Sequence, residues 1–178
     1  LAALNYDIRT REQMISDPGY YRLKNEEHIY HDWTWWVNES GRNQVDMQKA
    51  IFQSCDIYFY DLALDMGIDK MHDFLFRFGF GRNTTLDLPQ ASTGTLPSQQ
   101  WKRETYGQSW YPGDTLNSSI GQGFTEATPM QLATATLLMA NKGKWMRPGL
   151  LKQVGIEGLP VEPNRSLPDI ELENTDDW

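Results

Sequence analysis

The sequence predicts a mostly helical fold, and three stretches of the 178-residue chain carry that prediction. Residues 47–54 and 59–66 repeat mainly apolar side chains three or four positions apart, which is the spacing of one helix face. Thr128-Pro129-Met130-Gln131 is typical of a helix start, because threonine caps, proline suits the first helical position and glutamine bonds back to the cap. The count of such stretches favours helices, with few strands.

The stretch from Phe52 to Tyr60 joins two expected helices, over residues 43–54 and 57–66. Ser54 is predicted at the end of the buried face of the first helix, and Asp56 follows two residues later. Residues two apart do not share a helix face, so the backbone must turn for both side chains to enter one space. Two interpretations stay open: one residue caps the second helix, or both form a hydrogen-bonding pair in a cleft. On the local pattern alone, cap preferences favour the first.

The remaining elements are expected in chain order. Residues 1–5 are typical of the last turns of a helix, and the aromatic segment 12–40 predicts a loop or small hairpin packed by its own rings. A third helix is expected over residues 69–78, with Asp69 as its N-cap. Residues 85–89 predict a short extended piece, and residues 98–102 a helical turn. In the last helix the predicted buried stripe is Met130, Ala133, Leu137 and Ala140, and the helix is expected to stop at Asn141-Lys142-Gly143.

Composition bounds the function classes. The net charge of −8 argues against a nucleic-acid-binding protein, and no run approaches the roughly 18 apolar residues of a membrane helix. Seven acidic residues and one arginine lie within 156–178, so this segment carries −6 and residues 1–155 only −2. An acidic segment of this kind usually lies in solvent. The single cysteine, Cys55, cannot form an intrachain disulfide and does not fix the compartment.

Gly121 and Gly123 flank Gln122, and glycines in that position let a backbone approach another group closely. A lone Gly-x-Gly is weak evidence for any protein family. This one is followed at a fixed spacing by Thr128-Pro129 and by the Gln-Leu-Ala of residues 131–133, and the combined motif is specific enough to indicate a family. The family resemblance that this motif helps to carry, described next, implies that Gly121, Gln122 and Gly123 bind substrate.

These motifs carry a resemblance over residues 17 to about 148. The chain resembles the transpeptidase domain of class B penicillin-binding proteins, and among them the penicillin-binding protein 2 group of the elongation machinery. The resemblance implies an α/β fold, with this chain as the mostly helical portion of a serine β-lactamase-like transpeptidase domain. The matching stretches are Asp17-Pro18-Gly19-Tyr20-Tyr21, Ser54-Cys55-Asp56, Met66-Gly67-Ile68-Asp69, Phe78-Gly79-Phe80-Gly81, Leu86-Asp87-Leu88-Pro89, Trp110-Tyr111-Pro112-Gly113-Asp114-Thr115 and residues 120–133.

The family's chemistry needs Ser-x-x-Lys, Ser-x-Asn and Lys-Thr/Ser-Gly elements. Ser54-Cys55-Asp56 is similar to the second, with aspartate in the third place. The resemblance implies that the Ser54 hydroxyl bridges the catalytic serine and lysine and passes a proton toward the leaving amine. It also implies that Asp56 accepts a substrate amide N–H. An ionised aspartate only accepts hydrogen bonds, whereas asparagine both donates and accepts.

The other two elements do not occur in this sequence. No serine has lysine three residues on; Lys102 follows Ser98 by four, and Lys142-Gly143-Lys144 is not Lys-Thr-Gly. We therefore expect residues 1–155 to be a partial transpeptidase domain lacking both elements. Residues 156–178 are expected to form an acidic loop leading toward the missing Lys-Thr/Ser-Gly element. The chain alone is expected to be unable to form an acyl-enzyme.

A zinc site is a further implication of the resemblance. In relatives of penicillin-binding protein 2, two aspartates, a histidine and the cysteine of the Ser-x-Asp element hold zinc, and Asp17, Asp32 and Cys55 match three of these by context. The expected histidine is not found, so His31 or Glu39 substitutes for it or the site is lost. The alternative is a buried free cysteine beside two turn-forming aspartates.

The implied function is D,D-transpeptidation in peptidoglycan synthesis, on D-Ala-D-Ala stem peptides and with β-lactams as inhibitors. Transpeptidation itself requires no cofactor. The implied location is the periplasmic face of the bacterial inner membrane, with the anchor outside this chain, and the implied partner is a membrane glycosyltransferase of the elongation complex. A non-catalytic binding module and a β-lactam-sensing receptor of the same fold are the alternatives.

Overall fold

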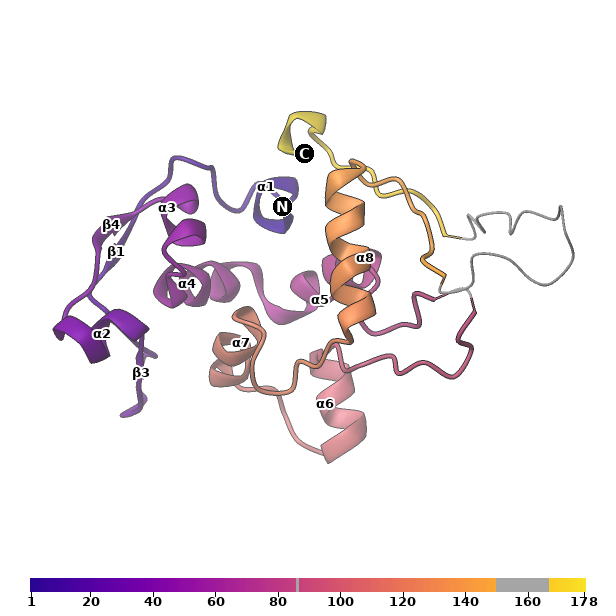
Figure 1. The fold of residues 1–178 in the computed structure, drawn as a ribbon. Helices are drawn as coiled ribbons and strands as arrows, with labels where there is room; N and C mark the ends of the chain where they lie inside the picture. The colour runs from indigo at the N-terminus through magenta and orange to yellow at the C-terminus, as the bar shows by residue number, and fades with distance from the viewer. Residues whose placement is uncertain (86, 150–166) are drawn as a thin grey trace, which may run out of the picture. The chain divides into compact units, whose positions relative to one another are not determined.

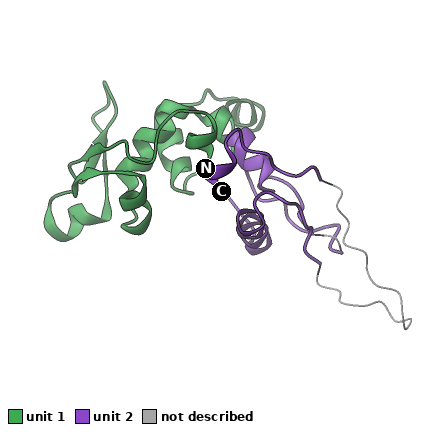
Figure 2. Cartoon of the chain, turned by 90° about the horizontal axis from the view of Figure 1, so that it is seen from above, with its two compact units in different colours: residues 1–71, 97–124 green, residues 72–96, 125–178 purple. Residues whose placement is uncertain are grey.

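The computed structural model describes residues 1–85, 87–149 and 167–178 (Figure 1). The chain divides into two compact units, each described here by itself (Figure 2). Unit 1 contains residues 1–71 and 97–124, and unit 2 contains residues 72–96 and 125–178. No helix among the described residues is long and apolar enough to cross a membrane.

Unit 1 combines short strands with a set of packed helices (Figure 1). Its strands form two antiparallel pairs, in which β1 pairs with β4 and β2 with β3. Helix α5 runs from unit 1 into unit 2. In chain order the elements are α1 (Ala2–Asn5), β1 (Ile15–Asp17), β2 (Tyr20–Arg22), β3 (Ile29–His31), α2 (Trp33–Asn38), β4 (Asn43–Val45), α3 (Met47–Phe52), α4 (Asp56–Met66), α5 (Ile68–Arg77), α6 (Gln99–Tyr106) and α7 (Pro112–Ser119).

Helix α4 is the centre of unit 1. It packs against α7, α3, β1 and β2, and most of its length is buried. Ile57 and Tyr58 are 1% and 0% exposed, and Leu116 of α7 and Val45 of β4 belong to the same apolar core. Because apolar burial is the main stabilising term in folding, this helix is a rigid support for the turn at its N-terminus.

The predicted first helix begins later than expected. Residues 43–45 form β4 instead of helix, because they pair with β1 in the register Ile15 to Val45. Helix α3 begins only after Asp46, whose side chain accepts the N–H of Lys49 at 2.7 Å. An N-cap aspartate is a standard helix start, so a local signal for the later boundary was present in the sequence.

Two other local predictions need correction. Asp69 is not an N-cap; it lies within α5 and accepts the N–H and the Nε2–H of Gln99 at 3.1 and 2.9 Å. The extended piece expected over residues 85–89 forms no strand in its described part: Asp87 lies in a bend, and the Asn83 side chain accepts the Thr85 N–H and donates to the Leu88 carbonyl. Leu86 lies outside the described residues. The helical turn expected at 98–102 is the longer helix α6.

Unit 2 contains α8 (Pro129–Ala140) and the 3-10 helix η1 (Thr175–Asp177). The predicted capping box of α8 is confirmed, since Thr128 and Gln131 bond to each other's backbone N–H at 3.1 and 2.8 Å. Beyond the undescribed residues 150–166, Ile170 and Leu172 of the acidic segment are buried.

The predicted buried stripe of α8 is wrong by about one position. Ala133 and Ala140 are exposed, and the buried residues are Gln131, Thr134, Ala135 and Leu138. Hydrogen bonds of a polar residue set the buried face, because the Gln131 Nε2 donates to the carbonyls of Arg82 at 2.9 Å and Thr93 at 2.7 Å. A pattern built on apolar residues alone therefore assigns this helix the wrong face.

Candidate active-site turn

The turn between α3 and α4 has the hydrogen bonds of a Schellman helix end, with Ser54 in its left-handed position. The N–H of Cys55 donates to the Ala50 carbonyl at 2.9 Å, and the N–H of Ser54 donates to the Ile51 carbonyl at 3.3 Å. Ser54 has φ +50°, a conformation that costs a residue with a Cβ about 1–2 kcal/mol. Glycine is the usual residue there. The chain therefore keeps a hydroxyl at a position where the backbone favours glycine.

This geometry rules out the capping interpretation of the Ser-x-Asp pair, and the hydrogen-bonding pair in a cleft stays a prediction. Ser54 is exposed, and Asp56 is the half-buried first residue of α4. The N-cap of α4 is Cys55, which makes no side-chain capping bond, so neither Ser54 nor Asp56 is the cap. The expectation that Ser54 ends a buried face is also wrong, because Ile51 on that face is itself exposed.

The free N–H at the start of α4 is satisfied from a distant segment. Asp32 accepts the Asp56 N–H through Oδ2 at 2.8 Å, and its Oδ1 accepts the Thr34 N–H and hydroxyl at 3.0 Å each. Asp32 is 0% exposed. One buried carboxylate thus serves as the N-cap of α2 and supplies a cap to α4.

Asp17 is a second buried carboxylate beside the turn. Its Oδ1 accepts the Gly19 N–H at 2.8 Å, and its Oδ2 accepts the Cys55 thiol at 3.4 Å. Burial alone opposes ionisation of Asp17, but the hydrogen bonds from Arg42, Gly19 and Cys55 outweigh it and hold the pKa below its usual range. Asp17 is therefore ionised at neutral pH.

Arg42 lies between the two carboxylates. Its Nη1 donates to Asp17 Oδ2 at 2.8 Å, and its Nη2 lies 3.0 Å from Asp32 Oδ1. The sequence analysis did not find Arg42. The available signal was indirect: two aspartates predicted close together beside a buried cysteine require a cation when they are buried.

The residues do not fit the zinc site that the resemblance implied. Asp17, Asp32 and Cys55 do converge, but Arg42 fills the space between the carboxylates. Of the suggested substitutes, His31 packs its ring against Trp35 and Trp36, and Glu39 is the C-cap of α2. Within residues 1–85, 87–149 and 167–178, no three His, Cys, Asp or Glu side chains are arranged to hold a metal ion.

The pKa values of the two ionisable side chains at the start of α4 are both raised above their ordinary values. Burial raises the pKa of the Cys55 thiol to about 12, so the free thiol is protonated at neutral pH. Burial, followed by the negative charge of Asp32, raises the pKa of Asp56 to about 6, against the opposing effect of Arg42. Near its pKa the Asp56 carboxyl is partly protonated, and in that form it donates as well as accepts a hydrogen bond.

The Gly121-Gln122-Gly123 turn follows α7 and repeats the backbone of the Ser54 turn. Gly121 has φ +74° and donates to the Ser118 carbonyl at 3.1 Å, and the Gln122 N–H donates to the Asn117 carbonyl at 2.9 Å. All three residues of the turn are exposed. Helix α7 packs along α4, but among the described residues no hydrogen bond or ion pair joins this turn to Ser54 or Asp56. A role of this turn in substrate binding stays a prediction.

The Trp-Tyr-Pro-Gly-Asp motif anchors the start of α7. The Asp114 carboxylate accepts the Tyr111 N–H at 2.8 Å and pairs with the buried Lys102 Nζ at 2.5 Å. The Lys102 ammonium also lies within 5.8 Å of the ring centres of Trp110, Tyr111 and Phe124. This motif therefore fixes the helix that carries the glycine turn.

The family described as "Penicillin binding protein transpeptidase domain" matches residues 1–168. This chain belongs to that family. The sequence-based recognition of a penicillin-binding transpeptidase domain is thereby confirmed.

Three related proteins place the chain among these transpeptidases. It is 42% identical to the peptidoglycan D,D-transpeptidase MrdA of Acinetobacter baumannii over 100% of this chain and 26% of that protein. The structure of Pseudomonas aeruginosa PBP2 in complex with WCK 5153 has a TM-score of 0.86 and 45% identity, over 99% of this chain and 39% of that one. A structure described as a peptidoglycan synthase complex that coordinates polymerization and crosslinking has a TM-score of 0.80 and 26% identity. The match covers 98% of this chain and 28% of that one.

The chain spans about a quarter of the length of the curated relatives it matches. The transpeptidase family relationship nevertheless covers the turn, since all of Asp17, Arg42, Ser54 and Asp56 lie inside the matched residues. The fold prediction is confirmed as the mostly helical part of an α/β penicillin-binding transpeptidase fold.

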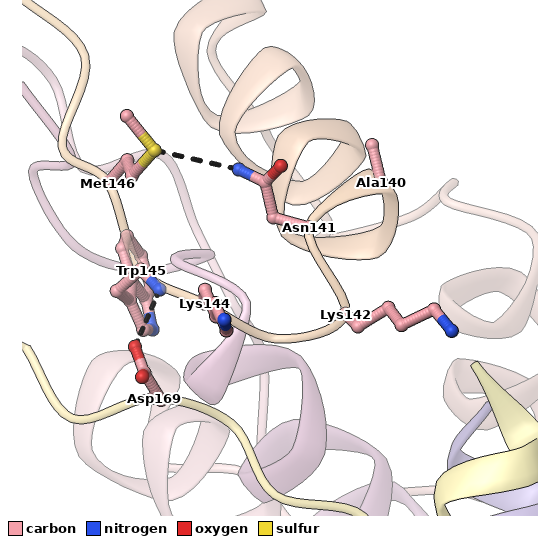
Figure 3. Close-up of a pocket in the computed structure, with 7 residues that line it drawn as sticks. All are labelled: Ala140, Asn141, Lys142, Lys144, Trp145, Met146 and Asp169. Carbon is pink, nitrogen blue, oxygen red and sulfur yellow. Dashed lines mark hydrogen bonds between the residues drawn. The ribbon is translucent and has the colours of Figure 1, made fainter.

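A pocket of about 590 Å³ in unit 2 of this transpeptidase domain lies at the end of α8 (Figure 3). Lys142 and Lys144 line it, and the Trp145 N–H donates to Asp169 Oδ1 at 2.8 Å beside it. None of the residues predicted for substrate or metal binding lines this pocket. The candidate active site is therefore the Ser54–Asp56 turn and not this pocket.

Proposed function

We propose that this chain supplies the Ser-x-Asp part of the active site of a peptidoglycan D,D-transpeptidase that also binds β-lactams. One observation carries the proposal: Ser54 keeps an exposed hydroxyl on a left-handed turn, two residues before Asp56 and beside the buried ion pairs of Arg42. A purely structural turn would favour glycine at Ser54. The family relationship and the D,D-transpeptidase named among the relatives support the same conclusion.

In the proposed reaction, a serine supplied outside residues 1–178 attacks the acyl carbon of a D-Ala-D-Ala stem peptide. The new serine–acyl bond forms as the amide C–N bond breaks, and the proton passes through the Ser54 hydroxyl to the leaving D-alanine nitrogen. Asp56 accepts a substrate amide N–H. An amine of a second stem peptide then attacks the acyl-enzyme: the cross-linking amide bond forms, the serine ester bond breaks, and the amine proton returns to the serine oxygen. With a β-lactam, the ring C–N bond breaks and the ring nitrogen takes the proton.

The proposed location and partner follow from the same relationship. The protein containing this chain is proposed to act at the periplasmic face of the inner membrane, together with a membrane glycosyltransferase of the elongation complex. The peptidoglycan synthase complex among the similar structures supports a partner that polymerises the glycan. Co-purification of the tagged protein from membranes with a glycan polymerase would test the partner; recovery of the protein alone after mild crosslinking would contradict it.

Covalent labelling with a fluorescent penicillin tests the activity. The whole protein that contains this chain is expected to label stoichiometrically. Ser54→Ala is expected to slow labelling about 10²- to 10⁴-fold, which is the range for losing a proton-transfer group. The 178-residue chain by itself is expected not to label. A whole protein that is folded but unlabelled would contradict the proposed function, and labelling of the isolated chain would place the nucleophile within it.

A further inference from the structure

We propose that Arg42 is a positioning residue that sets the Ser54–Asp56 turn, and that its guanidinium replaces the zinc ion which the resemblance implied for this cluster. The positioning part rests on the proposed function, whereas the replacement of zinc does not. The proposal starts from a disagreement: the expected ligands Asp17, Asp32 and Cys55 converge, but on an arginine.

Arg42 contacts four acceptors from three segments of the chain. Besides the two carboxylates, its Nη2 donates to the Gln53 carbonyl at 2.9 Å and the Ser54 carbonyl at 3.3 Å. A guanidinium is planar and carries five N–H donors in a fixed fork, so it can hold acceptors in several directions at once. It therefore joins the two buried carboxylates directly to the backbone of the turn.

The carbonyls that Arg42 holds belong to the residues that define the turn. Trp33 adds to this fixation, because its Nε1–H donates to the same carbonyls of Gln53 and Ser54 at 3.2 Å each. The Trp33 ring also lies 5.3 Å from the Arg42 guanidinium carbon. The Gln53 and Ser54 carbonyls belong to the peptide groups on either side of Ser54, and these two groups fix the direction of its Cα–Cβ bond. Arg42 therefore positions the base of the Ser54 side chain without touching the substrate.

Burial makes this ion cluster different from a surface pair. The Arg42 side chain is 7% exposed, and those of Asp17 and Asp32 are 0% exposed. Removing one partner of a buried ion pair leaves an uncompensated charge, which is strongly destabilising. A zinc ion would have to displace Arg42 from both carboxylates, so the arginine and the metal are alternatives for one position.

The chain offers a matched control in Arg9. Its side chain is 2% exposed and its Nη2 binds two carboxylates of α4, Asp61 at 2.7 Å and Asp65 at 2.6 Å. It resembles Arg42 in burial and charge, but its two carboxylate partners lie on the far part of α4 and not at the turn. Replacing Arg9 therefore tests the general cost of losing a buried, doubly paired arginine of unit 1 that does not touch the turn.

The experiment uses the whole protein with the variants Arg42→Gln, Arg42→Lys and Arg9→Gln. The measured quantities are the rate constant for acylation by a fluorescent penicillin well below the melting temperature, the melting temperature, and the zinc content after growth with added zinc. Arg42→Gln is expected to slow acylation about 10- to 100-fold, as for other supporting residues of a site. Arg9→Gln is expected to lower the melting temperature while acylating at the wild-type rate.

Arg42→Lys keeps the charge but cannot span the four acceptors, so it is expected to fold and to acylate at an intermediate rate. If Arg42→Gln does not fold, the acylation rate of Arg42→Lys tests the positioning role. Wild-type protein is expected to contain substoichiometric zinc and to keep its melting temperature in a chelator. Stoichiometric zinc, or a melting temperature lowered by the chelator, would overturn the replacement of the metal.

Wild-type acylation by either Arg42 variant would overturn the positioning role, as would an equal slowing in Arg9→Gln. If the folded wild-type protein were not acylated at all, the proposed function would fail. The zinc content and the chelator experiment would then still decide whether Arg42 takes the place of the metal.

Discussion

The Asp32 carboxylate accepts the backbone N–H of Asp56, 24 residues further along the chain, at 2.8 Å. The same side chain caps α2 and lies 3.0 Å from the Arg42 guanidinium. The start of α4, and with it the direction of the Asp56 side chain, therefore depends on a residue from another segment. This dependence gives the first of four predictions.

Asp32→Asn is expected to destabilise the protein by about 3 kcal/mol or more, because it removes a buried charge opposite Arg42. Asp46→Asn is the matched control. Asp46 also caps a helix, but it is only half-buried and asparagine caps as well as aspartate, so little change is expected. Thermal unfolding of both variants of the whole protein measures the difference. Equal melting temperatures would show that Asp32 acts only as a local cap.

Ser54→Gly is expected to raise stability by about 0.5–1 kcal/mol and to slow acylation about 10²- to 10⁴-fold, as Ser54→Ala does. Glycine relieves the left-handed backbone but loses entropy on folding, which reduces the gain. Lys142 provides the control, because it also has φ +50° in the same type of helix end, after α8. Lys142→Gly is expected to give a similar stability gain with normal acylation. Loss of stability in Ser54→Gly would mean that the hydroxyl itself stabilises the turn.

The raised pKa of Asp56 predicts a pH-dependent stability. The pKa of Asp56 is about 6 in the folded state against an ordinary value of 3.8, so the folded state holds a proton that the unfolded state loses first. The contribution of Asp56 is therefore fully present below about pH 4 and is lost as pH rises through about 6. Asp56→Asn mimics the protonated side chain. Its melting temperature relative to wild type is expected to rise over this window and then level off; a constant difference would contradict the shift.

Gly121→Ala and Gly123→Ala are expected to differ. At Gly121 an added Cβ meets open space, so only the backbone at φ +74° is strained, at about 1 kcal/mol. At Gly123 the added Cβ lies 3.0 Å from Asn117 Cβ in addition to φ +68°, so the loss of stability is larger. Thermal unfolding checks this order. If the turn contacts substrate, Gly121→Ala also weakens penicillin binding before acylation; unchanged binding would remove Gly121 from the substrate site.

Local sequence signals were sufficient to predict part of the structure. The break between α3 and α4, the capping box of α8 and the helix end at Asn141 all follow from residues within a few positions of each other. Such signals depend on local hydrogen bonds, which a single sequence contains. The family motifs added a prediction of what the turn does.

The missed features depend on distant partners. Arg42 meets Asp17 across 25 residues, and Gln131 reaches Arg82 across 49. No periodicity contains such pairings, and a buried glutamine contradicts the rule that buried faces are apolar. The residues 43–45 likewise became a strand through a partner near residue 15. Hydrogen bonds between distant segments therefore determine these three features, which local sequence preferences do not predict.

The mutual burial of Asp17, Asp32 and Arg42 also limits how this domain can change during evolution. A lineage that lost the arginine before it gained a metal site would pass through an intermediate with two buried carboxylates and no positive charge beside them. Such an intermediate folds poorly, so the exchange requires that the metal ligands be present first. Homologues that keep both aspartates are therefore expected to carry either the arginine or a complete metal site beside them.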